Sequence, residues 1–227
     1  MDGKVIVVSG ASGALGRIVV AVALARGGRV ASLGQAEPQA AAAAANRLEL
    51  GHVDLTDAAQ AKKAMDAAHA HFGKLDALIN VAGAFAFETV AEGDPKTWQR
   101  MFALNLTTAL NASRSAIPYL ATSGSGRIVN IGAMGALQAG AGMGAYAASK
   151  AGVHRLTEAL AAEWKGKITV NAVLPSIIDT AANRAAMPDA DFAKWVTPDE
   201  LASVILFLAG DAASGITGAL IPVPGRV

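Results

Sequence analysis

Residues 4–16 have the sequence KVIVVSGASGALG, and this stretch decides the fold class. Its first half is an apolar run that ends at Ser9, which is typical of a buried β-strand. Three glycines follow at positions 10, 13 and 16, and an apolar helical pattern begins directly after them. In a strand, glycine-rich turn and helix of this order, backbone N–H groups and the positive end of the helix converge on an anion. The stretch therefore predicts a phosphate site.

The spacing of the glycines favours a dinucleotide as the source of that phosphate. Gly10 permits the tight turn, Gly13 lets a pyrophosphate approach the backbone, and Gly16 allows the helix to pack closely on the strand. A glycine triplet alone also occurs in plain turns. The continuous apolar strand before it makes the binding site the better interpretation.

Short β-branched runs alternate with helical patterns along the rest of the chain. We expect strands near residues 4–9, 29–33, 49–53, 76–81, 127–131, 168–174 and 219–223. We expect helices near residues 14–27, 38–47, 57–71, 96–121, 145–165 and 198–209. Such alternation predicts parallel strands joined by right-handed crossovers, with helices on both faces. The predicted fold is α/β: a doubly wound parallel sheet of about seven strands in a single domain, residues 1–227.

Composition and charge narrow the class of partner. The chain has 227 residues, 53% of them hydrophobic, which is enough for one large core, and no Pro/Gly/Ser linker divides it. A net charge of +1 without long basic runs argues against nucleic acid or an anionic membrane as the main partner. The sequence has no cysteine, no leader-like segment and no apolar run of transmembrane length, which favours a cytoplasmic protein. We expect small-molecule partners.

Tyr146 and Lys150 are four residues apart near the start of an alanine-rich helical segment. This spacing puts both side chains on one helix face, so the ammonium group can favour the ionised phenol and lower its pKa. A phenol with a pKa of about 10 is a weak acid at neutral pH, and a lower pKa would make it a usable proton donor. The same spacing is common on ordinary helix faces, so the pair needs support from elsewhere.

These motifs together resemble the short-chain dehydrogenase/reductase family over essentially the whole chain. The family turn matches Ser9-Gly10, and a second family motif matches Asn80-Val81-Ala82-Gly83, with Val81 in place of an asparagine. The resemblance implies a Rossmann-type fold and hydride transfer with NAD(P). It implies cofactor contacts from Gly10, Ser12, Gly13, Leu15, Gly16, Asp54, Leu55, Asn80, Ala82, Gly83, Tyr146, Lys150, Pro175 and Thr180.

The resemblance also implies three catalytic residues. Tyr146 would deliver the proton, and Lys150 would lower the phenol pKa and hold the nicotinamide ribose. Asn105 matches the helix asparagine that supports a proton relay through water.

Ala133 is a departure from the family pattern. Most members have a serine thirteen residues before the tyrosine, and its hydroxyl stabilises charge on the substrate carbonyl. Loss of one such donor costs about 10²–10³ in rate. The dihydropteridine reductase branch of the family is similar to this chain in having alanine there and in its loop near residues 180–197. That likeness implies substrate contacts from Ala133, Phe85 and Met187.

Three functions are consistent with these residues. The first is reduction of a quinonoid dihydropterin by NAD(P)H. The second is reduction of another activated carbonyl, an imine or a quinone by the same fold. The third is a catalytically quiet module that senses NAD(P), for which Ala133 would mark lost chemistry, although a pure binder needs no tyrosine. The second strand ends at Gly34 without a carboxylate for the ribose 2′-hydroxyl, which gives a slight preference for NADPH.

Two further predictions concern metals and assembly. His69 and His71 are two residues apart on a helix and have no partners at metal-ligand spacing, so we expect no metal site. The family resemblance implies a homodimer or homotetramer built through the helices at 96–121 and 145–165. The small residues of the second helix suit close helix packing.

Overall fold

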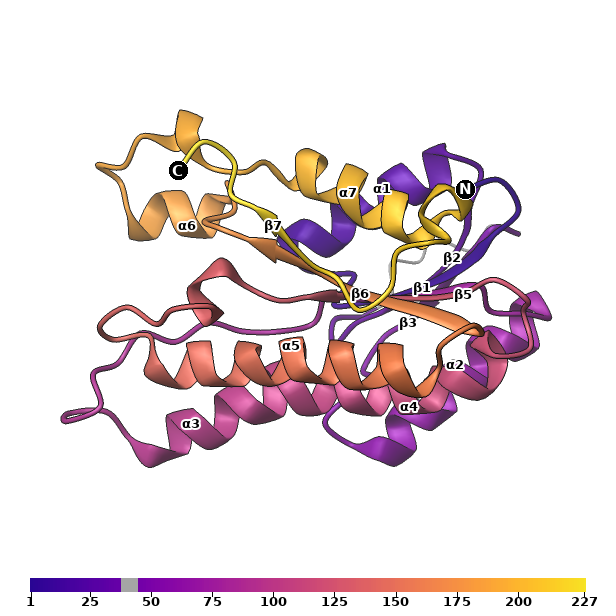
Figure 1. The fold of residues 1–227 in the computed structure, drawn as a ribbon, viewed down its shortest axis with the longest axis horizontal. Helices are drawn as coiled ribbons and strands as arrows, with labels where there is room; N and C mark the ends of the chain where they lie inside the picture. The colour runs from indigo at the N-terminus through magenta and orange to yellow at the C-terminus, as the bar shows by residue number, and fades with distance from the viewer. Residues whose placement is uncertain (38–44) are drawn as a thin grey trace.

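A computed structural model describes residues 1–37 and 45–227, and its seven strands form one sheet (Figure 1). In chain order the strands are β1 (Val5–Ser9), β2 (Arg29–Leu33), β3 (Arg47–Leu50), β4 (Ala77–Asn80), β5 (Gly126–Ile131), β6 (Ile168–Pro175) and β7 (Leu220–Val223). Their order across the sheet is β3-β2-β1-β4-β5-β6-β7, and every neighbouring pair is parallel. The chain builds outward from β1 in one direction and from β4 in the other, which is the predicted Rossmann-type doubly wound sheet.

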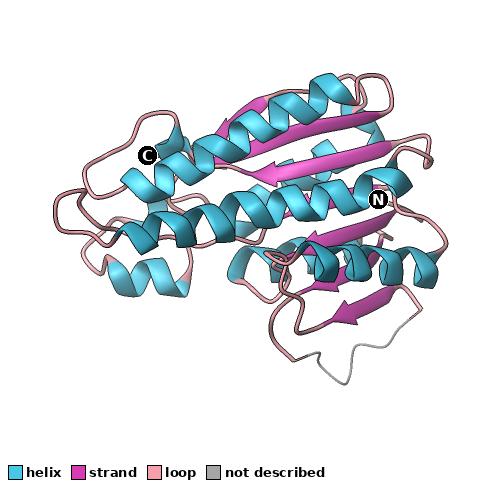
Figure 2. Cartoon of the chain, turned by 90° about the horizontal axis from the view of Figure 1, so that it is seen from below, coloured by secondary structure: helices cyan, strands magenta, loops and turns pink. Residues whose placement is uncertain are grey.

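Helices cover both faces of this sheet. Helices α1 (Ala14–Ala25) and α7 (Pro198–Ala209) pack together on one face, while α2 (Ala58–Phe72), α4 (Thr108–Leu120) and α5 (Gly144–Glu163) lie on the other (Figure 1). Figure 2 looks onto this second layer, with its long helices in front of the strands. Strand β1 serves both layers, because Ile6 and Val8 face the first core and Val5 and Val7 face the second. This alternation is the period of two that a strand imposes on its side chains.

The glycine turn between β1 and α1 has the geometry that its sequence predicts. Gly10 has a φ of +63°, a left-handed conformation that favours glycine. A Cβ atom at Gly16 would lie 2.1 Å from the carbonyl oxygen of Gly10. Any side chain at position 16 would therefore push α1 away from the turn.

The helix predicted over residues 96–121 is three elements. Helix α3 (Pro95–Met101) is followed by a π-helical segment, Phe102–Thr107, and then by α4. Asn105 lies inside the π-helical segment and is 1% exposed. Such a segment changes the direction of side chains relative to an α-helix, and it commonly occurs at functional sites.

The third strand also differs from the prediction. Strand β3 begins at Arg47 and ends at Leu50, earlier than the predicted 49–53, because it pairs in register with Val30 to Leu33 of β2. The helix predicted over 38–47 lies largely outside the described residues, and Ala45 and Asn46 form a turn before β3.

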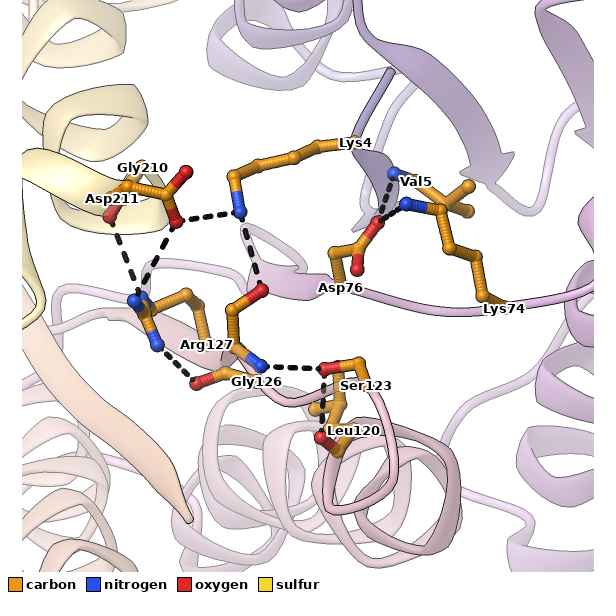
Figure 3. Close-up of polar contacts among 11 residues, drawn as sticks. Lys4, Val5, Lys74, Asp76, Leu120, Ser123, Gly126, Arg127, Gly210 and Asp211 are labelled. Atoms are coloured by element: carbon orange, nitrogen blue, oxygen red, sulfur yellow. Dashed lines mark hydrogen bonds and ion pairs between the residues drawn. The ribbon is translucent and has the colours of Figure 1, made fainter. Parts of the chain in front are cut away.

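A charged cluster holds the amino ends of the strands together (Figure 3). The Lys4 ammonium lies 2.8 Å from a carboxylate oxygen of Asp211, which follows α7, and Arg127 of β5 lies 3.8 Å from the same oxygen. The buried Asp76, just before β4, accepts a hydrogen bond of 2.8 Å from the backbone N–H of Val5. These contacts lie at the edge of the sheet opposite the glycine turn.

Candidate active site

The sequence-predicted site residues gather at the carboxyl ends of β1, β4, β5 and β6, together with the start of α5. In an open parallel sheet this edge forms a crevice where the strand order reverses, here between β1 and β4. The topology therefore brings together the glycine turn, the Asn80 motif, Ala133 and Tyr146.

The glycine turn fits a dinucleotide phosphate. Gly13 is the N-cap of α1, so the first N–H groups of the helix, including that of Leu15, have no partner four residues earlier. Ser12, Gly13 and Ala14 are exposed, although most of the surrounding residues are buried. An exposed backbone at the positive end of a twelve-residue helix is suited to bind a pyrophosphate. The side chain of Leu15 instead packs into the core.

The Asn80 side chain joins neighbouring elements of the fold, and its contact with a cofactor remains a prediction. Its side chain is buried and donates to Asn130 Oδ1 at 2.8 Å and to Ser113 Oγ at 3.1 Å. The amide therefore ties β4 to β5 and α4. Beside it, the backbone N–H of Ala82 donates to Ser9 Oγ at 3.2 Å, which joins the end of β4 to the end of β1.

Asp54 and Leu55 lie on the turn that leads into α2. Asp54 Oδ1 accepts hydrogen bonds from the backbone and hydroxyl of Thr56, at 2.9 and 2.7 Å. Leu55 is buried, and its carbonyl accepts from Asn111 of α4. These bonds hold the turn rigid, and its contact with an adenine remains a prediction.

The loop after Pro175 is well ordered by its own side chains. Thr180 caps α6 (Ala181–Ala186) by accepting a hydrogen bond from the backbone of Asn183, so its hydroxyl is engaged within the loop. Arg184 makes a two-pronged ion pair with Asp179 at 2.6 and 2.7 Å. Met187 ends this helix. Contacts of Thr180 with a cofactor and of Met187 with a substrate remain predictions.

Tyr146 lies in the first turn of α5 beside Phe85. The two rings meet edge to face, with centroids 4.9 Å apart. Within residues 1–37 and 45–227 the Tyr146 hydroxyl makes no hydrogen bond, so its proton is free for a substrate. Burial raises the pKa of Tyr146 to about 12. This direction is opposite to the predicted one.

Lys150 explains the difference. Its ammonium donates to the carbonyl of Ile131, at the end of β5, over 2.6 Å. Burial lowers the pKa of Lys150 to about 8. The Lys150 ammonium is therefore held by β5, and desolvation is the main influence on the pKa of the Tyr146 phenol.

Asn105 holds a loop in place with its side chain. Its amide group donates to the Ala84 carbonyl at 3.0 Å and to Ser149 Oγ at 2.9 Å, and its oxygen accepts from the Ala84 N–H at 2.8 Å. Ser149 in turn donates to the carbonyl of Tyr146. The side chain thus fixes the segment beside Phe85 against the start of α5. The water relay predicted for Asn105 is not tested by these contacts.

Ala133 is buried two residues after the end of β5, and its N–H donates to Nε2 of His154 at 3.3 Å. The sequence motifs did not single out His154 as a site residue. The spacing of His154 from Lys150 and Tyr146, four and eight residues along one helix face, is the signal that could have shown its place at the site.

Two of the other histidines, His69 and His71, lie on α2. His69 stacks on Tyr119 with ring centroids 4.3 Å apart. Across the part of the chain that the structure describes, no group of three or more His, Cys, Asp or Glu side chains could hold a metal ion. None of the described helices is long and apolar enough to cross a membrane.

Comparison with known proteins identifies the family. A sequence model described as short chain dehydrogenase matches residues 4–191. The chain belongs to this family. It is an NAD(P)-dependent short-chain oxidoreductase, as the sequence motifs implied.

Its relatives agree in fold and differ in substrate. The D-threitol dehydrogenase of Mycolicibacterium smegmatis is 33% identical over 244 residues, covering 99% of this chain and 93% of that enzyme. The 3-oxoacyl-[acyl-carrier-protein] reductase of Thermotoga maritima is 30% identical over 241 residues, covering 99% and 98%. The aldohexose dehydrogenase of Thermoplasma acidophilum, solved in ligand-free form, superposes with a TM-score of 0.89 at 29% identity, covering 99% of this chain and 94% of that chain.

Proposed function

We propose that this short-chain oxidoreductase uses NAD(P)H to reduce an activated acceptor of the quinonoid dihydropterin type, with Tyr146 as the proton donor. The observation that carries the proposal is the environment of the Tyr146 hydroxyl. Position 133 is alanine, so the hydroxyl that most family members carry there is absent, and the phenol has no hydrogen-bond partner among the described residues. Because Lys150 is tied to the Ile131 carbonyl, we assign proton delivery to Tyr146.

The chemistry supports a reductive direction. The nicotinamide, when bound, supplies the hydride. A phenol with a pKa of about 12 keeps its proton at neutral pH, as a donor must, whereas alcohol oxidation would need a phenolate base. A quinonoid acceptor spreads the arriving charge over its ring, so it depends less on a localised oxyanion donor than a ketone does.

The composition of two segments near Tyr146 and Ala133 supports a flat, ring-shaped acceptor. Residues 81–87 read VAGAFAF and residues 133–143 read AMGALQAGAGM, with Gln138 as the single polar side chain in both runs. The Phe85 ring is 58% exposed beside Tyr146. A polyol or sugar would require several hydrogen-bonding side chains to recognise its hydroxyls. The same apolar segments would also suit another activated carbonyl, imine or quinone, which is the second candidate.

The proposed cofactor is NAD(P)H, with a slight preference for NADPH. A Cβ atom at Gly34 would lie 3.1 Å from Ser12 Oγ, so this position faces the glycine turn. It carries no carboxylate to repel a 2′-phosphate.

The test compares two substrates in two proteins. Wild type should reduce a quinonoid dihydropterin with a higher kcat/KM than an unactivated ketone. Ala133→Ser should raise the ketone value by up to about 10²–10³ through the added donor, and should change the pterin value much less. Ala136→Ser, which adds the same hydroxyl one turn further along, is the control and should change neither. A wild type that reduces ketones well and pterins not at all would refute the dihydropterin proposal.

A further inference from the structure

His154 is a buried residue on the helix that carries Tyr146 and Lys150. It lies on the same face of α5 as Tyr146 and Lys150, one turn beyond the lysine, and it is 2% exposed. The side chains of Lys150 and His154 reach the end of β5 and the residues that follow it. Two of the three side chains on this helix face therefore contact the segment Ile131–Ala133.

Two side chains of α5 bind this segment through its backbone. Lys150 donates to the Ile131 carbonyl at 2.6 Å, and Nε2 of His154 accepts the Ala133 N–H at 3.3 Å. The sheet holds only part of the segment, through the bond of 2.9 Å from the Gly132 N–H to the Val173 carbonyl. Without the histidine, the N–H of the buried Ala133 would have no partner among residues 1–37 and 45–227.

The space for the imidazole depends on Gly132. A Cβ atom at this position would lie 2.5 Å from Nε2 of His154. The imidazole ring therefore fits directly against the backbone of the segment, and it can do so because residue 132 is glycine.

The imidazole is held in its neutral form. Because Nε2 accepts the Ala133 hydrogen bond, the ring proton is on Nδ1. Burial lowers the pKa of His154 to about 4, and the nearby charges of Lys150 and then Arg155 act in the same direction. The ring is thus a permanent acceptor at neutral pH.

We propose that His154 is a positioning residue for the reduction: it sets the distance between α5, which carries Tyr146, and residue 133, which faces the hydride acceptor. This inference rests on the proposed function, because the positioning acts on proton delivery by Tyr146. The cofactor contacts expected at the glycine turn come from β1 and α1, and these contacts do not depend on His154.

Two variants separate the acceptor from the bulk of the side chain. In His154→Gln the amide oxygen is as many bonds from Cα as Nε2 and can accept the Ala133 N–H. In His154→Asn the oxygen is one bond shorter and cannot reach it. We expect His154→Gln to keep kcat within about threefold and His154→Asn to lower it by about 10²-fold, with the cofactor dissociation constant of both unchanged. Equal kcat in the two variants, high or low, would overturn the proposal.

Hydrogen exchange of the Ala133 amide, followed by NMR, tests the contact without turnover. The amide should be protected in the wild type and in His154→Gln and should exchange faster in His154→Asn. An amide that exchanges freely in the wild type would overturn the proposal even if both variants failed to fold. A wild type that reduces no acceptor but shows the protected amide would instead refute the proposed function and leave the contact intact.

Discussion

Tyr146 carries the proposed proton transfer, and the chain supplies its own control. Tyr146→Phe removes the donor but leaves Lys150 and the glycine turn in place, so turnover should fall by about 10²–10⁴-fold while cofactor still binds. The other tyrosine, Tyr119, donates to Asp66 on α2 far from the site, and Tyr119→Phe should keep turnover. Steady-state rates and cofactor fluorescence measure both effects. Near wild-type rates in Tyr146→Phe would show that Tyr146 is not the general acid.

The protonation state of Lys150 sets the pH dependence that we expect for kcat of the reduction. Burial lowers its pKa to about 8, so the ammonium is present below this pH and is lost above it. The Tyr146 pKa of about 12 puts phenol ionisation outside the accessible range. We expect kcat to be flat from pH 6 to 7 and to fall above pH 8. Lys150→Met should lower kcat, raise the cofactor KM and lose this alkaline limb, whereas a limb that persists in the variant would belong to another group.

Gly34 is the residue at which cofactor preference can be changed. Gly34→Asp would place a carboxylate beside Ser12, where it can accept a ribose 2′-hydroxyl and repel a 2′-phosphate. The ratio of kcat/KM for NADH over NADPH should rise by about tenfold or more, since one lost or gained charged contact amounts to about 1.5–3 kcal/mol. Gly34→Ala, which adds only the Cβ, should leave the ratio unchanged. An unaltered ratio in the aspartate variant would place the ribose elsewhere.

At the scale of elements, the π-helical segment Phe102–Thr107 links α3 and α4 to the site. Its buried Asn105 reaches the backbone of Ala84 and the side chain of Ser149 at once. An uninterrupted α-helix would direct this side chain differently relative to α5. The local sequence could not predict the interruption, because its partners are 21 and 44 residues away.

Substitutions at the amino ends of the strands should lower the stability of the protein without lowering its activity. Asp76 is buried and accepts the Val5 N–H, while Lys74 lies 2.9 Å from the same oxygen. Asp76→Ala leaves that N–H unpaired and should lower the free energy of unfolding by about 1–3 kcal/mol. Asp211 also pairs with Lys4 but its side chain is 73% exposed, so Asp211→Ala should cost at most about 1 kcal/mol.

Urea unfolding and kcat measured on the same samples would check this contrast. Both variants should keep the wild-type kcat, because the reacting groups are at the opposite edge of the sheet. Equal stability losses in the two variants would show that burial is not what makes Asp76 important.

For the whole molecule, an apolar stripe predicts assembly. Trp98, Phe102 and Leu110 follow one another along α3, the π-helical segment and α4, and they are 38%, 38% and 43% exposed. Exposed aromatic and aliphatic side chains in a row are typical of subunit interfaces. We propose a homodimer or homotetramer through these helices and α5. Light scattering should give a dimeric or tetrameric mass for wild type and a smaller one for Leu110→Glu.

A substitution on the opposite layer controls for a general effect of added charge. Phe207 is 46% exposed on α7, on the other face of the sheet, so Phe207→Glu should leave at least a dimer. A monomeric wild type, or a mass unchanged by Leu110→Glu, would rule out the proposed interface.

The sequence by itself determined the fold class, the general alternation of strands and helices, and the motifs that place the chain in its family. These features depend on short-range patterns: the apolar run before Gly10, the period of two in β1, and the four-residue spacing of Tyr146 and Lys150. It could also show that position 133 lacks a hydroxyl. Family membership follows from the same motifs.

Only the tertiary structure decided what those side chains do. It anchored Lys150 on Ile131, raised the pKa of Tyr146 where a lower one was expected, and turned Asn105 toward Ala84. It also placed His154 against Ala133, 21 residues away along the chain. Hydrogen-bond partners and desolvation are set by segments that meet only when the sheet and its helices pack, so no local pattern contains them.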